Sequence, residues 1–251
     1  MDVIIRTAAL SAAALIAACA PHPTKQATAP PPAPPKGEPV VPESPGKTRA
    51  PAGAYTLDHN HSTLVFRVSH MGFSRYVGQF AKLDGRLAFD PAHPERMVVK
   101  ASVDARSLVT PEPPPGFRET ILGKDWLNAG SFPEITFRST KVAVVPPNHA
   151  QVTGDLTLHG VTRPVTLWAT FNGGYPANVM DGARIGFSAE GAFRRSDFGI
   201  ATGLPPPGTN LGVGDLVAVT LETEWNSGGP LPQQAAATSA PGASAPSTAP
   251  R

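Results

Sequence analysis

Three histidines early in the chain are the residues best suited to bind a metal. His59 and His61 share one face of an extended segment, because side chains alternate with period two, whereas His70 has the opposite parity. A metal site needs three or four converging ligands, and no Cys or carboxylate cluster joins these histidines. We therefore expect hydrogen-bonding roles near a strand end, and the sequence predicts no metal site.

Catalytic chemistry has no clear candidate either. A nucleophile requires a neighbouring base and an oxyanion donor. Ser188 in Gly186-Phe187-Ser188-Ala189-Glu190 lacks the second glycine of a nucleophile elbow and falls on the polar face of its segment. Glycine-rich phosphate loops and HExxH pairs are absent from the sequence. Arg195 and Asp197 could form an ion pair, which we interpret as a structural clamp on a loop. The sequence predicts that the protein is not an enzyme.

Eight segments between residues 54 and 226 alternate with period two, which is typical of half-buried antiparallel strands. Strands buried on both faces would read as continuous apolar runs instead. The apolar residues expected to face the interior, and to contact an apolar ligand if that interior is hollow, are Leu64, Phe66, Val68, Leu83, Leu87, Phe89, Val99, Val103, Ile135, Phe137, Val152, Leu156, Leu158, Leu167, Phe171, Ile185, Phe187, Phe193, Val217, Val219 and Leu221.

One segment breaks this rhythm, because Phe117–Asn128 carries apolar residues at near-helical spacing. We expect a short helix there, at one end of an all-β domain. Eight strands with one apolar face each can stack as a sandwich or close into a barrel, and the pattern alone does not decide. Small inward residues favour a cavity, whereas Phe187 and Trp225 could fill the same space; the small residues are Ala101, Gly154, Ala169, Ala189 and Gly191.

Composition limits the classes of partner. The chain has 30 Pro and 24 Gly, only 16% charged residues and a net charge of +2, which fits strands with flexible ends and offers no surface for nucleic acid. Residues 1–18 read as a signal peptide, too short to span a membrane, that ends directly before Cys19, the only cysteine. We expect Cys19 to be lipidated, 19–53 to be a Pro-rich disordered linker, 54–226 the folded domain and 227–251 a disordered tail.

Several motifs, which follow one another in the same order along the chain, resemble those of the YceI-like, polyisoprenoid-binding family. They include Asp58-His59-Asn60-His61-Ser62, Gly154-Asp155-Leu156-Thr157-Leu158-His159-Gly160-Val161-Thr162-Arg163-Pro164-Val165 and Arg195-Ser196-Asp197-Phe198-Gly199. The resemblance implies an all-β fold, an eight-stranded antiparallel lipocalin-like barrel with a short helix at one end. It also implies an exported bacterial protein with a long isoprenoid chain, such as a quinone side chain, inside the barrel.

Two departures from the family pattern concern the polar end of the site. The helix has Arg118-Glu119-Thr120-Ile121 where the family has an Arg-Asp pair followed by His, and the loop Ala201–Gly212 is lengthened by prolines. His70, Arg118, Arg195 and Asp197 remain the candidates for that polar end.

The leading hypothesis is a periplasmic, membrane-anchored lipoprotein, facing the periplasm from the outer membrane, that carries or buffers an isoprenoid lipid or quinone. It needs no cofactor besides that ligand. The alternatives are an enzyme acting on such a lipid, through the same four polar residues, and a tethered adaptor with a filled barrel.

Overall fold

The computed structural model describes residues 48–111, 114–179 and 181–227. The expected signal peptide, Cys19, the linker up to residue 47 and the C-terminal tail from residue 228 lie outside the described residues. Across the described ranges, the helical segments lack the length and apolar character of a membrane-spanning helix.

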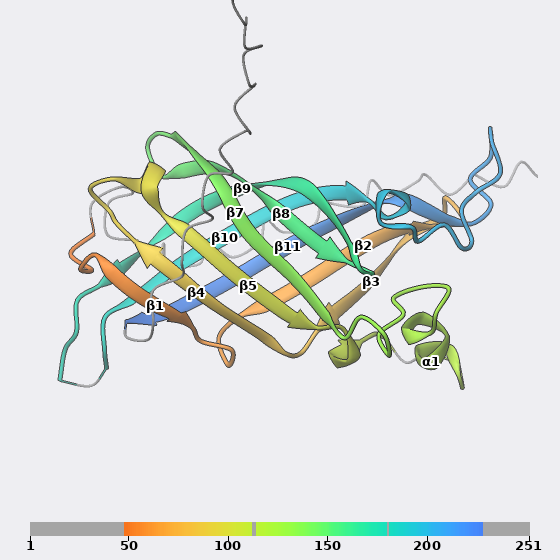
Figure 1. The fold of residues 1–251 in the computed structure, drawn as a ribbon, viewed down its shortest axis with the longest axis horizontal. Coiled ribbons are helices and arrows are strands. Elements are labelled where there is room, and N and C mark those ends of the chain that lie inside the picture. Colours follow the sequence, from red (N-terminus) through yellow and green to blue (C-terminus); the bar gives the residue numbers. More distant parts are fainter. Residues whose placement is uncertain (1–47, 112–113, 180, 228–251) are drawn as a thin grey trace, which may run out of the picture. The chain divides into compact units, whose positions relative to one another are not determined.

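Eleven strands form one antiparallel sheet in the described part of the chain. The sheet closes on itself as a ring of eight strands in the order β1-β4-β5-β7-β8-β9-β10-β11, because β1 pairs with both β4 and β11. The all-β, eight-stranded barrel predicted from the sequence is thereby confirmed (Figure 1). The strands are β1 (Gly53–Leu57), β2 (Thr63–His70), β3 (Ser74–Phe80), β4 (Leu83–Phe89), β5 (Val98–Asp104), β6 (Leu108–Val109), β7 (Glu134–Val145), β8 (His149–Leu158), β9 (Val161–Tyr175), β10 (Arg184–Arg194) and β11 (Val213–Ser227).

Three strands outside the ring continue ring strands toward one end of the barrel. β1 and β2 both pair with β11. On their other side, β1 pairs with β4 and β2 pairs with β3. Next in order, β4 pairs with β5 and β3 pairs with β6. Three long strands are therefore each interrupted by a break: β1–β2 at Asp58–Ser62, β3–β4 at Ala81–Lys82 and β5–β6 at the 3-10 turn η2 (Ala105–Ser107). Two further 3-10 turns are η1 (Pro94–Arg96) and η3 (Arg195–Phe198).

The helix α1 (Phe117–Leu122) lies at the end of the barrel where β2 and β3 meet (Figure 1). It is shorter than the predicted Phe117–Asn128, because the backbone becomes extended at Gly123. A helix of six residues is unstable alone and needs tertiary contacts. The rings of Phe117 and Tyr76 on β3 supply one such contact, with centroids 5.9 Å apart.

The wall is incomplete beside this helix. β6 pairs with β3, and β5 pairs with β7 only over Lys100–Asp104, while no pairing joins β6 to β7 in the described residues. The segment carrying α1 connects these two strands and lines the interior there through Phe117, Ile121, Trp126 and Leu127. Beside α1 the cavity wall is thus formed by side chains of this segment and not by a sheet.

Candidate functional site

An elongated cavity of about 820 Å³ occupies the interior of the barrel. On β11 its wall runs from Val213 to Trp225, twelve residue steps. At about 3.3 Å per residue and a strand tilt of about 40°, these steps span about 30 Å along the barrel axis. Apolar side chains from every ring strand except β1 alternate into it, and β1 contributes Leu57 alone. The cavity excludes a solid interior, which the filled-barrel alternative requires.

Inward-facing glycines keep large side chains against the wall. A Cβ atom built on each of four glycines would lie 2.4–2.8 Å from a side chain of another strand, closer than real Cβ contacts. The side chain therefore occupies the space above the glycine instead of projecting into the lumen. The four pairs are Gly78 with Phe66, Gly85 with Trp225, Gly154 with Phe137 and Gly191 with Leu167.

This arrangement refines the expectation that small residues thin the core. Ala101, Ala169 and Ala189 line the cavity directly, whereas Gly154 and Gly191 are covered by neighbouring side chains. Phe187 and Trp225, the residues weighed as possible fillers, line the cavity wall and leave the lumen open.

The structure places all the apolar residues predicted to face the interior on the cavity wall except Ile185. Ile185 is fully buried in a cluster at the barrel end opposite α1, where it packs with Tyr55, Phe89 and Trp225. Lining residues absent from the prediction include Trp126 of the helix segment, Leu57 of β1 and Tyr76 of β3, and a further group at the β7–β8 turn that includes Val144 and His149. The apolar spacing of the helix segment was a usable signal for the first of these.

Arg195 is a buried cation at the α1 end of the cavity. Its side chain lines the cavity, and the residue is only 4% exposed. Nε donates to the carbonyl of Gly214 (2.9 Å), Nη1 to those of Ile200 (3.0 Å) and Thr202 (2.8 Å), and Nη2 to that of Val213 (2.8 Å). The guanidinium also lies over the ring of Trp126, 5.2 Å from its centroid.

These contacts use four of the five N–H donors of the guanidinium. Burial lowers the pKa of Arg195, and the charge of Asp215 opposes that shift, so the group remains a cation. The predicted ion pair between Arg195 and Asp197 is wrong, because the guanidinium binds carbonyl oxygens and Asp197 is exposed at the surface. The structural-clamp interpretation of Arg195 holds, with loop carbonyls as the acceptors.

The other predicted polar residues divide between the cavity and the outside. His70 lines the cavity at its exposed rim. Arg118 is not part of the cavity wall, and its guanidinium instead donates to the carbonyls of Leu108 (3.1 Å) and Arg106 (2.5 Å). It therefore ties α1 to β6, at the edge where the sheet ends. Arg118 and Asp197 are thus separated from the cavity that we expected them to serve.

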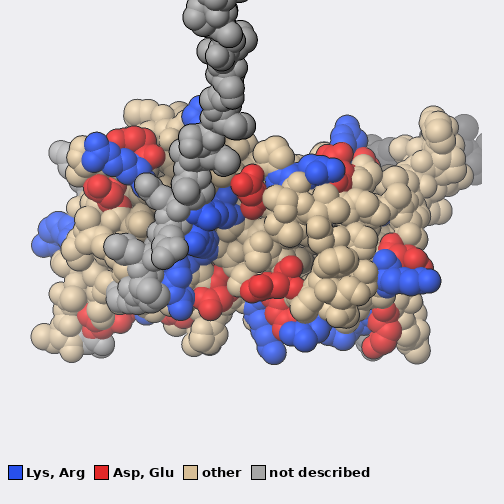
Figure 2. Space-filling model, viewed as in Figure 1, with Lys and Arg blue, Asp and Glu red and all other residues tan. Residues whose placement is uncertain are grey.

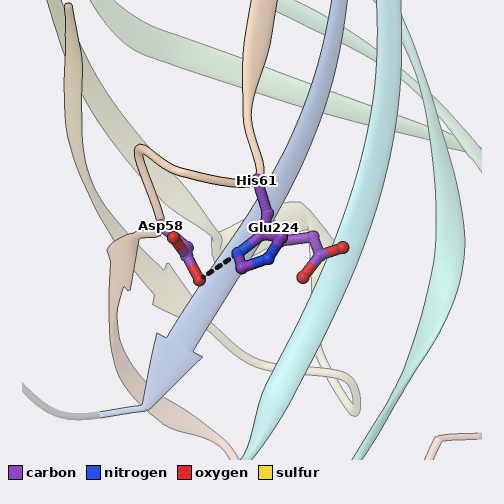
Figure 3. A group of neighbouring side chains, drawn as sticks. All are labelled: Asp58, His61 and Glu224. Carbon is purple, nitrogen blue, oxygen red and sulfur yellow. Dashed lines mark hydrogen bonds and ion pairs between the residues drawn. The ribbon is translucent and has the colours of Figure 1, made fainter.

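The histidines do not converge on a metal site with one another. Among the described residues, the group that could hold an ion is Asp58, His61 and Glu224, outside the barrel (Figure 3). His61 Nδ1 lies 2.9 Å from Asp58 Oδ2, and Arg184 Nη1 bridges Asp58 Oδ2 (2.9 Å) and Glu224 Oε2 (2.5 Å). The guanidinium already forms ion pairs with both carboxylates.

Burial alone would raise the pKa of Asp58, but hydrogen bonds from His61, Arg184 and Asn226 outweigh it and hold the pKa well below its ordinary range. The cluster thus fastens the break between β1 and β2 to β10 and β11.

Ser188 lies on the outer face, where its hydroxyl donates to Glu222 Oε2 (2.5 Å) and accepts from Asn172 Nδ2 (2.9 Å). Both contacts are cross-strand bonds of the barrel surface, away from the cavity. The serine is therefore structural, as its sequence context indicated.

The fold and the cavity define a closed antiparallel β-barrel with an elongated apolar interior. The sequence profile of the YceI-like domain matches residues 55–225, from β1 to the end of β11. The chain therefore belongs to the YceI-like family, as the resemblance of its motifs indicated.

Related proteins of similar sequence come from Pseudomonas. A UPF0312 protein of Pseudomonas savastanoi pv. phaseolicola is 38% identical over 154 residues, covering 61% of this chain and 79% of its own length. One from Pseudomonas fluorescens is 37% identical over 167 residues, covering 64% and 83%. The names of these relatives describe no reaction.

Solved structures share the fold. BcnA of Burkholderia cenocepacia has a TM-score of 0.56 and 26% identity, covering 67% of this chain and 98% of its own. A polyisoprenoid-binding domain from Saccharophagus degradans, implicated in plant cell wall breakdown, has a TM-score of 0.51 and 15% identity, covering 69% and 98%. At that identity the second likeness concerns the fold alone.

Proposed function

We propose that the barrel binds one long, slender apolar lipid of the isoprenoid or isoprenoid-quinone type along its axis. The observation that carries the proposal is the cavity itself, about 820 Å³ in volume and walled by apolar side chains. Distributed over about 30 Å, this volume averages about 27 Å² in cross-section, a circle just under 6 Å wide. Carbon atoms in contact lie about 4 Å apart, so this width suits a single chain.

Apolar burial alone supplies enough free energy for binding. Each buried CH₂ contributes about 0.8 kcal/mol, so a five-carbon unit contributes roughly 4 kcal/mol before costs. Ordering the chain and losing its translational freedom offset much of this gain. Several units in the cavity therefore bind tightly without a dedicated polar motif, which is consistent with the few polar groups on the wall.

The head group of the lipid belongs at the α1 end under this proposal. His70 lies on the rim there, and Arg195 presents a guanidinium whose fifth N–H donates to none of the four loop carbonyls. A carbonyl or hydroxyl oxygen, such as a quinone carries, can accept from these groups. The polyisoprenoid ligand of the Saccharophagus degradans relative is consistent with this class of lipid.

The biological role that we propose is that of an exported carrier or buffer. Cys19 after a short signal run would anchor the protein to the membrane, with the barrel facing the periplasm. A carrier is needed in the periplasm because an isoprenoid chain exposes a large apolar surface, and its transfer into water is unfavourable unless a protein shields it.

Intrinsic fluorescence tests the proposal. Trp126 and Trp225 line the cavity, whereas Trp168 lies on the outer face, stacked on His149 with centroids 5.5 Å apart. We expect an isoprenoid quinone to quench the tryptophan fluorescence until one ligand is bound per chain. In the Trp168→Phe variant, the same quinone should quench at least as large a fraction of the remaining fluorescence. Quenching that comes mainly from Trp168, or that never saturates, would contradict binding inside the barrel.

A further inference from the structure

Two adjoining loops at the α1 end each expose a large apolar side chain. Phe73 in the turn between β2 and β3 is 87% exposed, and Leu211 in the loop between η3 and β11 is 61% exposed. The loops touch directly, since Met71 N donates to the Gly212 carbonyl at 2.7 Å. Gly72 sits against Asn210 with a positive φ of 72°, so no larger residue fits there without strain. We call Phe73, Leu211 and the prolines 205–207 the apolar tip.

The apolar tip borders the cavity. His70 at the end of β2 pairs with Val213 at the start of β11, and both residues line the cavity. Each of the two loops begins or ends at one of these residues. The tip is therefore the rim of the cavity at the α1 end and not a remote surface.

Hydrogen bonds fasten the loop that carries Leu211 to the barrel at its base. Arg195 binds the carbonyls of Thr202 and Val213, and backbone bonds join Val213 N to the Gly203 carbonyl (2.7 Å) and Thr209 N to the Pro206 carbonyl. Leu211 is thus exposed to solvent on a loop whose base is hydrogen-bonded, although this exposure of an apolar side chain does not stabilise the fold.

Charge is missing from this loop. The stretch Ala201–Gly212 contains no Asp, Glu, Lys or Arg. In Figure 1 the loop projects beyond the start of β11, on the side of α1, and in Figure 2 the projection on the same side shows no charged residues. Arg75 follows Phe73 by two residues and is exposed, so a cation stands just behind the apolar residues.

We propose that the apolar tip docks the cavity rim onto the surface of a lipid bilayer. The inference rests on the proposed function, because an apolar ligand dissolves in membranes and enters the barrel most easily where the rim touches one. Apolar side chains buried at the headgroup boundary, backed by a cation near anionic lipid, are the features by which proteins bind this interface. The loop has no charged side chain that could orient a soluble protein partner by electrostatic complementarity.

A fluorescent label on the tip tests this proposal in the full chain. Cys19→Ser removes the only cysteine and the anchoring site, so that Phe73→Cys can carry a single environment-sensitive dye. The matched control is Val179→Cys, because Val179 is fully exposed in the loop between β9 and β10, at the opposite end of the barrel. The probe is a vesicle of phosphatidylcholine with a minor share of phosphatidylglycerol.

We expect the dye at position 73 to brighten severalfold on vesicles and to be quenched by lipids with nitroxide-bearing chains, while the dye at 179 stays unchanged. Phe73→Ser and Leu211→Ser should each weaken vesicle binding by about tenfold, because each removes the burial of one large apolar side chain. Val179→Ser should leave it unchanged.

A dye at 73 that ignores vesicles, or responds no more than the one at 179, overturns membrane docking and leaves the tip to a protein partner. Failure of the proposed function looks different. Should the barrel bind no lipid while the dye at 73 still enters the bilayer, the binding function fails and the docking surface stands. A lipid-filled barrel with an unresponsive tip would instead overturn the docking surface and leave the binding function intact.

Discussion

Ala189 offers a way to block the cavity without touching its ends. It lies on β10 between Ala169 of β9 and Leu221 of β11, and all three side chains line the lumen. Replacing Ala189 with Trp places an indole in empty space, so we expect no loss of stability. From Leu221 to Trp225 the wall continues for four residues, about 10 Å along the axis. The longest free stretch therefore falls from about 30 Å to about 20 Å.

The expected loss of affinity follows from this shortening. Bonds of about 1.5 Å advance an extended carbon chain by about 1.25 Å, so 10 Å holds about eight carbons. At about 0.8 kcal/mol for each, they contribute about 6 kcal/mol before costs. If ordering of the chain cancels half, about 3 kcal/mol is lost, which is a weakening of about 100-fold.

Titration with isoprenoids of increasing length measures this effect. Ala189→Trp should bind ligands that fit within about 20 Å within a few fold of the unsubstituted protein, and should lose about 100-fold for ligands that span the cavity. Ala192→Trp is the control, because Ala192 lies on the same strand but faces solvent. Equal losses for short and long ligands, or for the two variants, would refute binding along the barrel axis.

Three further predictions concern stability. Arg195→Met removes the donor from four loop carbonyls and should cost about 3 kcal/mol, or about 6–12 °C in Tm, with Arg195→Lys intermediate; an unchanged Tm in calorimetry would show that the clamp is dispensable. Gly154→Ala puts a Cβ 2.5 Å from both the Phe137 ring and the Arg138 carbonyl oxygen, and should cost about 1–3 kcal/mol in urea denaturation. Gly186→Ala, whose Cβ meets nothing closer than 3.7 Å, should be nearly neutral, and equal effects of the two changes would contradict the packing argument. Because the pKa of Asp58 is depressed on folding, its contribution to stability is complete above about pH 5 and is lost as the pH falls below about 4; Asp58→Asn should lower stability at neutral pH and flatten this acid slope, and parallel pH profiles for the two proteins would contradict it.

The alternation of residues in the sequence determined which side of the wall each side chain occupies, but not how far along the barrel it lies. Phe187 and Ile185 have the same parity on β10, yet Phe187 lines the cavity and Ile185 packs into the end cluster. Period two carries no information about depth, because every inward residue of a strand gives the same signal. The choice between a hollow and a solid interior was open for the same reason.

The elements missing from the sequence prediction are β1, β3 and β6, each of which adjoins a break. β1 has five residues and β6 has two, and β3 is interrupted on its inward face by Gly78. The first two runs are too brief for alternation to be recognised, and the glycine removes the apolar signal from the middle of the third. The hydrogen-bond acceptors of Arg195 could not be predicted either, because every residue has a backbone carbonyl whatever its type. The nearby carboxylate of Asp197 suggested a partner that the structure does not show.

Native mass spectrometry of the gently purified protein can identify what fills the barrel. We expect a single bound mass per chain, which organic extraction releases as an isoprenoid or isoprenoid quinone. The same mass should persist in Ala192→Trp, and in Ala189→Trp it should disappear or give way to a smaller one. A protein that carries no lipid, and takes none up from isoprenoid-loaded micelles, would show that the barrel does not hold an isoprenoid chain.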